Sequence, residues 1–370
     1  MSRLAFGRSA LVLGGLLLGL AGVELIARVV RPAGHADLLF DAPDASPRDL
    51  YVIDPELVLV PRAGFSDTIR SQGYTVPLAF DGDGVRIVPG GPDAPSQPRW
   101  AAVGDSFTLA VQVAAEQTFS HQLGVATGRT FLNLGVDGYS TWQASRRAAR
   151  IDRTRDTDGV LLTFFLGNDL QDNERFPHVL QTVAGREAGT PIPRPTVSRW
   201  TSLLLRHSAL YAHTRVWSRA QSIRSGADPA RERWRGELAI FSAEGRSTLQ
   251  HLIPATREAL AEVRRSVRSR GDSLLVALAP PAFVIHPERL ASTFEVVGLD
   301  PSLATPDAPR DAVLRELERL GIRTCDLTPA LRTAAEAGDA LYFTYDGHWT
   351  AAGHAVVAAA LRACVAEENP

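Results

Sequence analysis

Small and polar residues follow three successive apolar stretches in the first half of the chain. They are Gly104-Asp105-Ser106, Gly135-Val136-Asp137-Gly138 and Gly167-Asn168-Asp169. A serine on such a turn exposes its hydroxyl at the start of a helix, whose backbone N–H groups favour developing negative charge. Glycine lets a backbone N–H approach a reacting oxygen closely, and asparagine supplies a neutral side-chain donor. Together these residues indicate a nucleophile and three oxyanion donors.

A nucleophilic serine needs a base, and the best-placed histidine lies in the segment Asp346-Gly347-His348-Trp349-Thr350. Asp346 is close enough in sequence to hold the far nitrogen of the imidazole and to stabilise the imidazolium, as a triad requires. The other candidates are weaker. His354 is expected inside a helix, where it packs or caps, and His286 is expected to line a pocket.

Neighbours of these residues have simpler expected roles. We expect Asp105 and Asp169 to brace loops, and Thr350 to cap the helix that follows His348. Trp349 is expected in the core, although a platform for a sugar is the alternative.

The elements that must position these residues alternate between apolar strands and longer helical patterns. This rhythm predicts an α/β fold with a five-stranded parallel sheet covered on both faces. Ligands of such sheets bind beyond the carboxyl ends of the strands, which is where the three polar segments lie. The expected strands are 100–103, 130–134, 160–166, 273–278 and 321–326, and the main expected helices are 116–127, 142–151, 200–223, 255–270, 310–320 and 351–366.

At this point the sequence resembles the SGNH (GDSL-like) hydrolase superfamily, from the block around Ser106 to the block around His348. The family's blocks are matched by Gly-Asp-Ser at 104–106, an asparagine and glycine at 133–138, a shortened Gly-Asn-Asp at 167–169, and Asp346 with His348. The resemblance implies a three-layer, flavodoxin-like fold with Ser106 as nucleophile and His348 and Asp346 completing the triad. It also implies an oxyanion hole made by the N–H groups of Ser106 and Gly138 and by the amide of Asn168.

One departure from the family pattern concerns the acid. The usual spacing is Asp-x-x-His, whereas this chain has Asp346-x-His348-Trp349, which resembles the alginate O-acetyltransferase-like branch. The acid of the triad is therefore expected one residue closer to its histidine than in the usual family pattern.

The N-terminus predicts a membrane segment. Arg3 and Arg8 precede an apolar run from Ala10 to Val23 that contains only Leu, Val, Gly and Ala. A small-residue site at 19–21 lies inside this run, so we expect an uncleaved signal anchor over residues 1–31, with a cleaved signal peptide or a buried helix as alternatives. After this anchor we expect a linker and irregular collar at 32–98. A hydrolase domain is expected at 99–370, with an inserted helical lid at about 171–242.

Composition removes other classes of function. The net charge of −2 provides no positive electrostatic field that would attract nucleic acid. All 39 Lys and Arg residues are arginine, so the chain cannot form a lysine Schiff base or a P-loop. Asp81-Gly82-Asp83-Gly84 suggests calcium, but Val85 breaks the EF-hand pattern and a turn is expected.

The two cysteines, Cys325 and Cys364, lack metal-binding spacing. The sequence leaves two arrangements open with equal weight: a disulfide, which an oxidising compartment would allow, or two buried free thiols. No metal and no cofactor is expected.

Three functions remain. The first is an esterase that removes O-acyl groups, above all acetyl groups, from an envelope or extracellular glycan. The second is an O-acyltransferase that moves an acetyl group onto a polysaccharide beside a membrane acyl-donor protein. The third is a non-catalytic carbohydrate-binding protein with the same fold, which requires a broken constellation. The expected location is the cell membrane, with the catalytic domain on the periplasmic or extracellular side.

Overall fold

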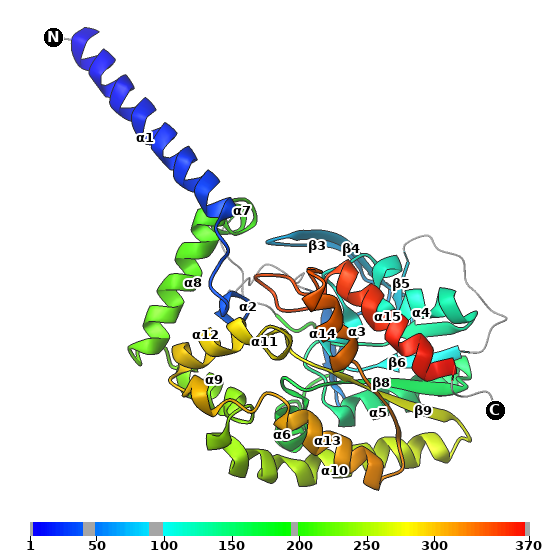
Figure 1. Cartoon of the computed structure of the whole chain (residues 1–370). Helices are drawn as coiled ribbons and strands as arrows, with labels where there is room; N and C mark the ends of the chain where they lie inside the picture. The colour runs from blue at the N-terminus through cyan, green and yellow to red at the C-terminus, as the bar shows by residue number, and fades with distance from the viewer. Residues whose placement is uncertain (1–2, 40–48, 89–98, 194–198, 367–370) are drawn as a thin grey trace.

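The computed structural model describes residues 3–39, 49–88, 99–193 and 199–366 (Figure 1). Parts of the predicted collar, including residues 89–98, lie outside these residues. An eight-stranded sheet, in the order β10-β9-β8-β6-β7-β5-β4-β3, forms the centre of the body. Its strands are β3 (Ser66–Ser71), β4 (Tyr74–Phe80), β5 (Arg86–Ile87), β6 (Arg99–Val103), β7 (Thr130–Asn133), β8 (Gly159–Phe165), β9 (Ser273–Ala279) and β10 (Arg323–Asp326).

Five of these strands form the predicted parallel sheet. Strand β6 lies between β7 and β8, and β9 and β10 follow on the β8 side, all in parallel. This is the flavodoxin-like order 2-1-3-4-5, so the predicted fold class is confirmed. The topological switch point, where such sheets bind ligands, lies between β6 and β8.

The predicted count of five strands is wrong for the whole sheet. The antiparallel strands β5, β4 and β3 extend it beyond β7, through the pair Arg86 and Asn133. They come from the segment expected to be an irregular collar, where Pro, Gly and Asp interrupt the strand pattern. A separate hairpin pairs β1 (Tyr51–Asp54) with β2 (Val58–Pro61). The collar therefore covers an edge of the sheet that would otherwise be unpaired.

Side chains of the parallel strands alternate between two cores. In β6, Ala101 and Val103 pack into one core while Trp100 and Ala102 pack into the other. The first core is completed by α5 (Thr141–Arg155), α6 (Asp169–Gln181), α10 (Arg246–Arg268), α12 (Pro287–Val297) and α13 (Ala308–Arg319), and the second by α4 (Phe119–Thr127), α14 (Thr328–Glu336) and α15 (Ala351–Ala366). The result is the predicted three-layer arrangement, with helices on both faces of the sheet (Figure 1).

The inserted segment differs in detail from its prediction. The single helix expected at 200–223 is two helices, α7 (Arg199–His207) and α8 (Ala209–Arg224), and α9 (Ala230–Ala239) follows them. The break falls at Ser208, whose hydroxyl accepts the backbone N–H of Tyr211 and so caps the start of α8. The role of this insertion as a lid remains a prediction.

Helix α1 (Arg3–Val29) projects away from the body (Figure 1). Its segment Leu11–Val29 has a mean hydropathy of 1.9 and is only 6% buried. The helix is long and apolar enough to cross a membrane, and a signal sequence near the N-terminus has the same features.

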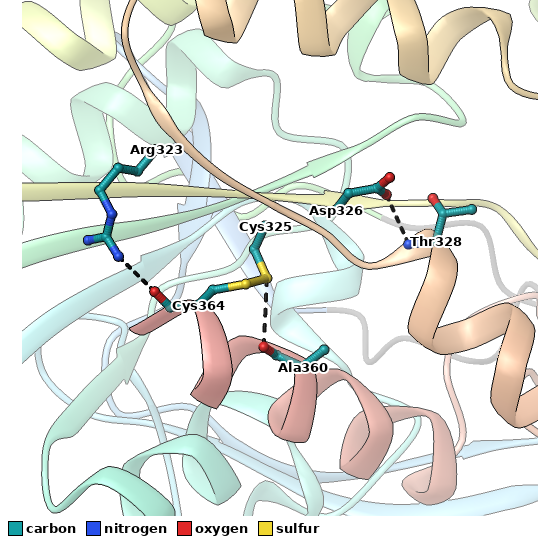
Figure 2. Close-up of a disulfide and its surroundings, with 6 residues drawn as sticks. All are labelled: Arg323, Cys325, Asp326, Thr328, Ala360 and Cys364. Atoms are coloured by element: carbon teal, nitrogen blue, oxygen red, sulfur yellow. Dashed lines mark hydrogen bonds between the residues drawn. A yellow bond between two sulfur atoms is a disulfide. The ribbon is translucent and has the colours of Figure 1, made fainter. Parts of the chain in front are cut away.

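A disulfide joins Cys325 on β10 to Cys364 on α15 (Figure 2). Beside it, the Arg323 guanidinium donates to the Cys364 carbonyl at 2.7 Å. These contacts fasten the closing helix to the edge strand of the sheet. Of the two arrangements expected for the cysteines, the structure has the paired one.

Replacing Cys325 and Cys364 together by Ala is expected to lower the free energy of unfolding by about 4 kcal/mol. The estimate follows from the chain entropy of a loop closed across a separation of 39 residues. Urea unfolding of both proteins, with and without reductant, measures it. Reductant should destabilise only the parent protein, and equal midpoints in all four experiments would contradict this role.

Candidate active site

Ser106 is the first residue of a short helix, α3 (Ser106–Leu109), that begins just beyond the end of β6. The Asp105 carboxylate accepts the N–H of Phe107 at 2.9 Å and caps this helix. The turn is tight: a Cβ atom on Gly135, beyond β7, would lie 2.1 Å from the backbone nitrogen of Leu109. Only glycine fits there, so its close approach packs the loop after β7 against the serine helix.

A continuous chain of hydrogen bonds joins Ser106, His348 and Asp346. The His348 Nε2 atom lies 2.7 Å from the Ser106 hydroxyl. Its Nδ1 atom is hydrogen-bonded to Oδ1 of Asp346. With Nδ1 donating to the carboxylate, Nε2 is left to accept the serine proton, which is the tautomer that a serine triad requires. The structure therefore brings together three residues that the sequence singled out, the outermost of which are 242 positions apart in the chain.

Asp346 has two further partners that the sequence did not reveal. The Tyr74 hydroxyl donates to Oδ2 of Asp346 at 2.7 Å, and the Gln112 amide donates to Oδ1 at 3.0 Å. Tyr74 belongs to β4 of the collar, and Gln112 follows α3. Both carboxylate oxygens are thus held, which fixes the plane of the carboxylate relative to the imidazole.

Aromatic rings support the imidazole from one side. The Phe107 ring stacks on Phe165 with centroids 4.0 Å apart and lies 4.7 Å from the His348 ring. Trp349 meets Phe107 edge-on and is fully buried, so it is a core residue as expected. Thr350 caps the next helix as predicted, since its hydroxyl accepts the N–H of Gly353 at 3.2 Å.

The surroundings of Asp346 and His348 favour an ionised carboxylate next to a more basic imidazole. Burial disfavours the charged imidazolium, but the Asp346 carboxylate outweighs it and raises the pKa of His348 to about 8. Burial likewise disfavours the Asp346 carboxylate, yet His348 and the Tyr74 hydroxyl hold its pKa below the usual value. Asp346 therefore remains ionised beside a histidine of raised basicity.

Gly138 and Asn168 follow the ends of β7 and β8, on either side of β6. Gly138 is exposed in a turn with a positive φ of 69°, where glycine is favoured. The Asn168 amide donates to Oδ2 of Asp172 at 2.6 Å, which uses one of its two protons. Burial raises the pKa of Asp172 to about 7. Both residues lie at the same edge of the sheet as Ser106, as predicted from the parallel topology.

Two buried acids beneath the site hold turns. Asp105 caps α3, and the Asp169 carboxylate accepts the N–H of Phe165 at 2.9 Å. Burial raises the pKa of Asp105 to about 7 and that of Asp169 well above its ordinary value. These hydrogen bonds match the bracing roles expected from the sequence.

The other histidines are engaged elsewhere. His354 is buried in α15, where its Nδ1 accepts the N–H of Phe119 at 3.2 Å, and burial lowers its pKa to about 3. His286 lies 3.7 Å from the Glu288 carboxylate. Among the described residues, the histidine that is hydrogen-bonded to the Ser106 hydroxyl is His348.

The acidic turn near residue 81 contains a guanidinium among its carboxylates. Arg155 donates to Asp81 at 2.6 Å and to Asp83 at 2.8 Å. Among the described residues, no group of three His, Cys, Asp or Glu side chains is arranged to hold a metal ion. Asp81–Gly84 therefore forms a turn, as predicted, paired with an arginine.

A comparison with protein families agrees with this site. Residues 240–370 match the family model described as "SGNH hydrolase-like domain, acetyltransferase AlgX". The match includes Asp346 and His348, and Ser106 lies before it. With the fold, it agrees with the resemblance to the SGNH superfamily and its AlgX-like branch, and it supports an SGNH-type enzyme, a hydrolase or an acyltransferase. No curated protein matches the chain.

Several solved structures have a distantly similar shape. A putative lipolytic protein of the G-D-S-L family from Desulfitobacterium hafniense is 11% identical, with 72% of this chain and 98% of that chain covered and a TM-score of 0.37. An acetylxylan esterase from Geobacillus stearothermophilus, solved as a catalytic mutant, is 11% identical, with 74% and 95% covered and a TM-score of 0.37. A carbohydrate esterase family 2 enzyme from Corynascus thermopiles is 12% identical, with 77% and 69% covered and a TM-score of 0.39. Likenesses of this size carry no argument about activity.

Proposed function

We propose that this protein is a serine esterase that removes O-acyl groups, above all acetyl groups, from an envelope or extracellular glycan. The observation that carries the proposal is the hydrogen-bonded chain from the Ser106 hydroxyl through His348 to Asp346. Gly138 and Asn168 follow the neighbouring strands at the same edge of the sheet, which supports them as donors to a developing oxyanion.

The reaction would proceed through an acyl-serine. The Ser106 oxygen forms a bond to the ester carbonyl carbon while its proton passes to Nε2 of His348. The tetrahedral oxyanion accepts hydrogen bonds from the N–H groups of Ser106 and Gly138 and from the free amide proton of Asn168. When the carbon–oxygen bond to the sugar breaks, His348 returns the proton to the departing hydroxyl. Water, deprotonated by His348, then releases the acid and restores Ser106.

An acyltransferase of the same mechanism is the second candidate. It replaces water by a sugar hydroxyl in the last step, and the acyl group would come from a membrane acyl-donor protein. The family description and the Asp346-x-His348-Trp349 spacing favour it. A non-catalytic glycan-binding protein is disfavoured, since all five residues of the expected constellation are present.

The location we propose is the cell membrane, with α1 as a single-pass anchor and the catalytic domain on the periplasmic or extracellular side. The apolar span supports the anchor. The bond between Cys325 and Cys364 supports an oxidising compartment, because cytosolic thiols are usually kept reduced.

One assay tests the function and separates its two enzymatic forms. The full chain in detergent is incubated with an activated acetyl ester, with and without an acetylatable oligosaccharide, and acetate and sugar masses are followed. Acetate release in both mixtures supports the esterase, and acetylated sugar formed in preference to acetate supports the transferase. Glycan binding without turnover of any ester, and unaffected by Ser106→Ala, would support the binding protein instead.

The pH profile should report His348. The base must be neutral to accept the serine proton, and its pKa is raised to about 8. We therefore expect kcat/KM to be low in acid and to rise with pH through about 8 before reaching a plateau. Initial rates between pH 5 and 10, with a substrate stable in that range, measure it. A profile that is already flat at pH 6 would contradict a charged pair of this kind.

Tyr74→Phe should reduce kcat by about tenfold, because it removes one hydrogen bond of about 1.5 kcal/mol to the Asp346 carboxylate. Tyr74 is a positioning residue, so KM should change little. Tyr342→Phe is the matched control: this buried hydroxyl donates to the Pro280 carbonyl at 2.9 Å instead. Equal kcat losses in both variants would indicate a general loss of packing and not a role at Asp346.

A further inference from the structure

Helix α7 presents an apolar face that no part of the described structure covers. Trp200 is 76% exposed, Leu203 44% and Leu204 43%. Their spacing of i, i+3 and i+4 places them on one side of the helix. Leu205 points the other way and is buried with Ala212 and Val216 of α8. The helix is therefore anchored by one apolar residue and offers three others outward.

Hydrogen bonds between α1 and the junction of α7 and α8 determine where the apolar face of α7 lies. The Arg28 guanidinium donates to the carbonyl of His207, the last residue of α7, at 2.6 Å. The Glu24 carboxylate accepts hydrogen bonds from the Ser208 hydroxyl and from the N–H groups of Ala209 and Leu210, at 2.8 to 3.1 Å. The junction of α7 and α8 is thus fixed to the last turns of α1. Figure 1 shows α7 at the foot of α1, with α8 running away from it.

Basic side chains gather at the same level. A cavity of about 360 Å³ at this junction is lined in part by Arg206, His207 and His213, and by Arg28, whose guanidinium is paired with the Glu24 carboxylate at 2.9 Å. A neighbouring cavity of about 480 Å³ adds Arg70 from β3. An apolar face bordered by arginines is typical of amphipathic helices that bind in the headgroup region of a membrane.

We propose that α7 is an interfacial helix that lies in the membrane surface beside the span, with Trp200, Leu203 and Leu204 among the lipid acyl chains. The occupant of this face is the bilayer itself, because α7 is joined to the end of the proposed span and its border is basic. The proposal rests on the proposed anchor and not on the proposed chemistry. Two attachments, α1 and α7, then hold the body in one orientation.

That orientation has a consequence for the active site. Tyr345, next to Asp346, lines the cavity at the foot of α1 together with Arg28. The loop that carries Asp346 and His348 is therefore held near the membrane surface. Substrates presented at that surface, whether glycan chains or an acyl donor in the membrane, would meet the site without a long-range movement of the body.

Tryptophan quenching tests the proposal directly. The chain has six tryptophans, and none lies in α1, so the span itself contributes no signal. We would reconstitute the full chain into phosphatidylcholine–phosphatidylglycerol vesicles with and without bromine on the acyl chains. The brominated lipids should quench part of the fluorescence of the parent protein. Trp200→Phe should lose most of this quenching, and the Leu203→Gln, Leu204→Gln double variant should weaken it while Trp200 remains.

Trp217→Phe is the matched control. Trp217 is 65% exposed but lies on α8, about 12 Å along the helix from its start. Its variant should be quenched like the parent protein, and so should Ser106→Ala, whose chemistry is a separate question. Quenching that is absent from the parent protein, or unchanged in Trp200→Phe, would overturn the proposal, including the case in which a protein partner covers this face.

Discussion

Replacing Ser106 by Ala is expected to lower kcat for ester turnover by about 10⁶-fold, the size of effect seen when a serine enzyme loses its nucleophile. The hydroxyl is the atom that would form the acyl bond, and no other serine is hydrogen-bonded to His348 in the described structure. Removal of one oxygen should leave the fold intact. Acetate release under saturating activated ester, with unfolding midpoints of both proteins, measures the effect.

The control for this experiment is Ser225→Ala. Ser225 lies at the end of α8, and its hydroxyl donates to the Ser222 carbonyl at 3.0 Å. It should retain full turnover. Turnover by Ser106→Ala within tenfold of the parent protein, with the fold unchanged, would exclude Ser106 as the nucleophile.

Asp346→Asn is expected to lower kcat by about 10⁴-fold, as the corresponding change does in other serine triads. The neutral amide removes the charge that raises the pKa of His348, and it can hold the imidazole in the wrong tautomer. The residual activity should also respond to pH differently, with the rise of kcat/KM shifted below pH 8. Rates across the pH range for both proteins provide the two readouts.

Asp339→Asn makes the same chemical change at an exposed position seven residues earlier. It should alter neither kcat nor the pH profile. Asp346→Asn with nearly full activity would show that His348 works without this acid. It would mean that Asp346, at its shorter spacing from His348, does not have the usual role of the triad acid.

The parallel part of the fold could be predicted because its signals are local. Apolar strands such as 160–166 stop abruptly at glycine and polar residues, and the observed β8 differs by one residue at each end. The closing helix at 351–366 has the expected bounds. Ser106 and His348 stand directly at such boundaries, so the topology of a parallel sheet was enough to bring their elements to one edge.

Other features depend on contacts between distant segments. Strand β4 alternates between buried and exposed residues, but Pro77 and the surrounding turns hide that pattern in the sequence. Tyr74 reaches Asp346 across 272 residues, and nothing local to either residue indicates it. Gln112 likewise follows a buried segment with no motif of its own. The positioning residues of the site were therefore missed because tertiary packing alone brings them to Asp346.

The insertion shows a third kind of limit. A continuous helix was expected at 200–223, because both halves have an amphipathic pattern. The break at Ser208 coincides with the Glu24 carboxylate of α1, which hydrogen-bonds to the start of α8. The capping ability of Ser208 was visible in the sequence, but the partner that stabilises the break lies 184 residues earlier.

The most direct test of the central claim is to locate the acyl group. The full chain is mixed with an activated acetyl ester, quenched in acid within the first turnovers, digested and mapped by mass. We predict a single added acetyl group, on the peptide that contains Ser106, which disappears when a glycan acceptor or further time is allowed. An acetyl group that accumulates on another residue, or turnover with no acetylated peptide in the parent protein, would contradict an acyl-serine mechanism at this site.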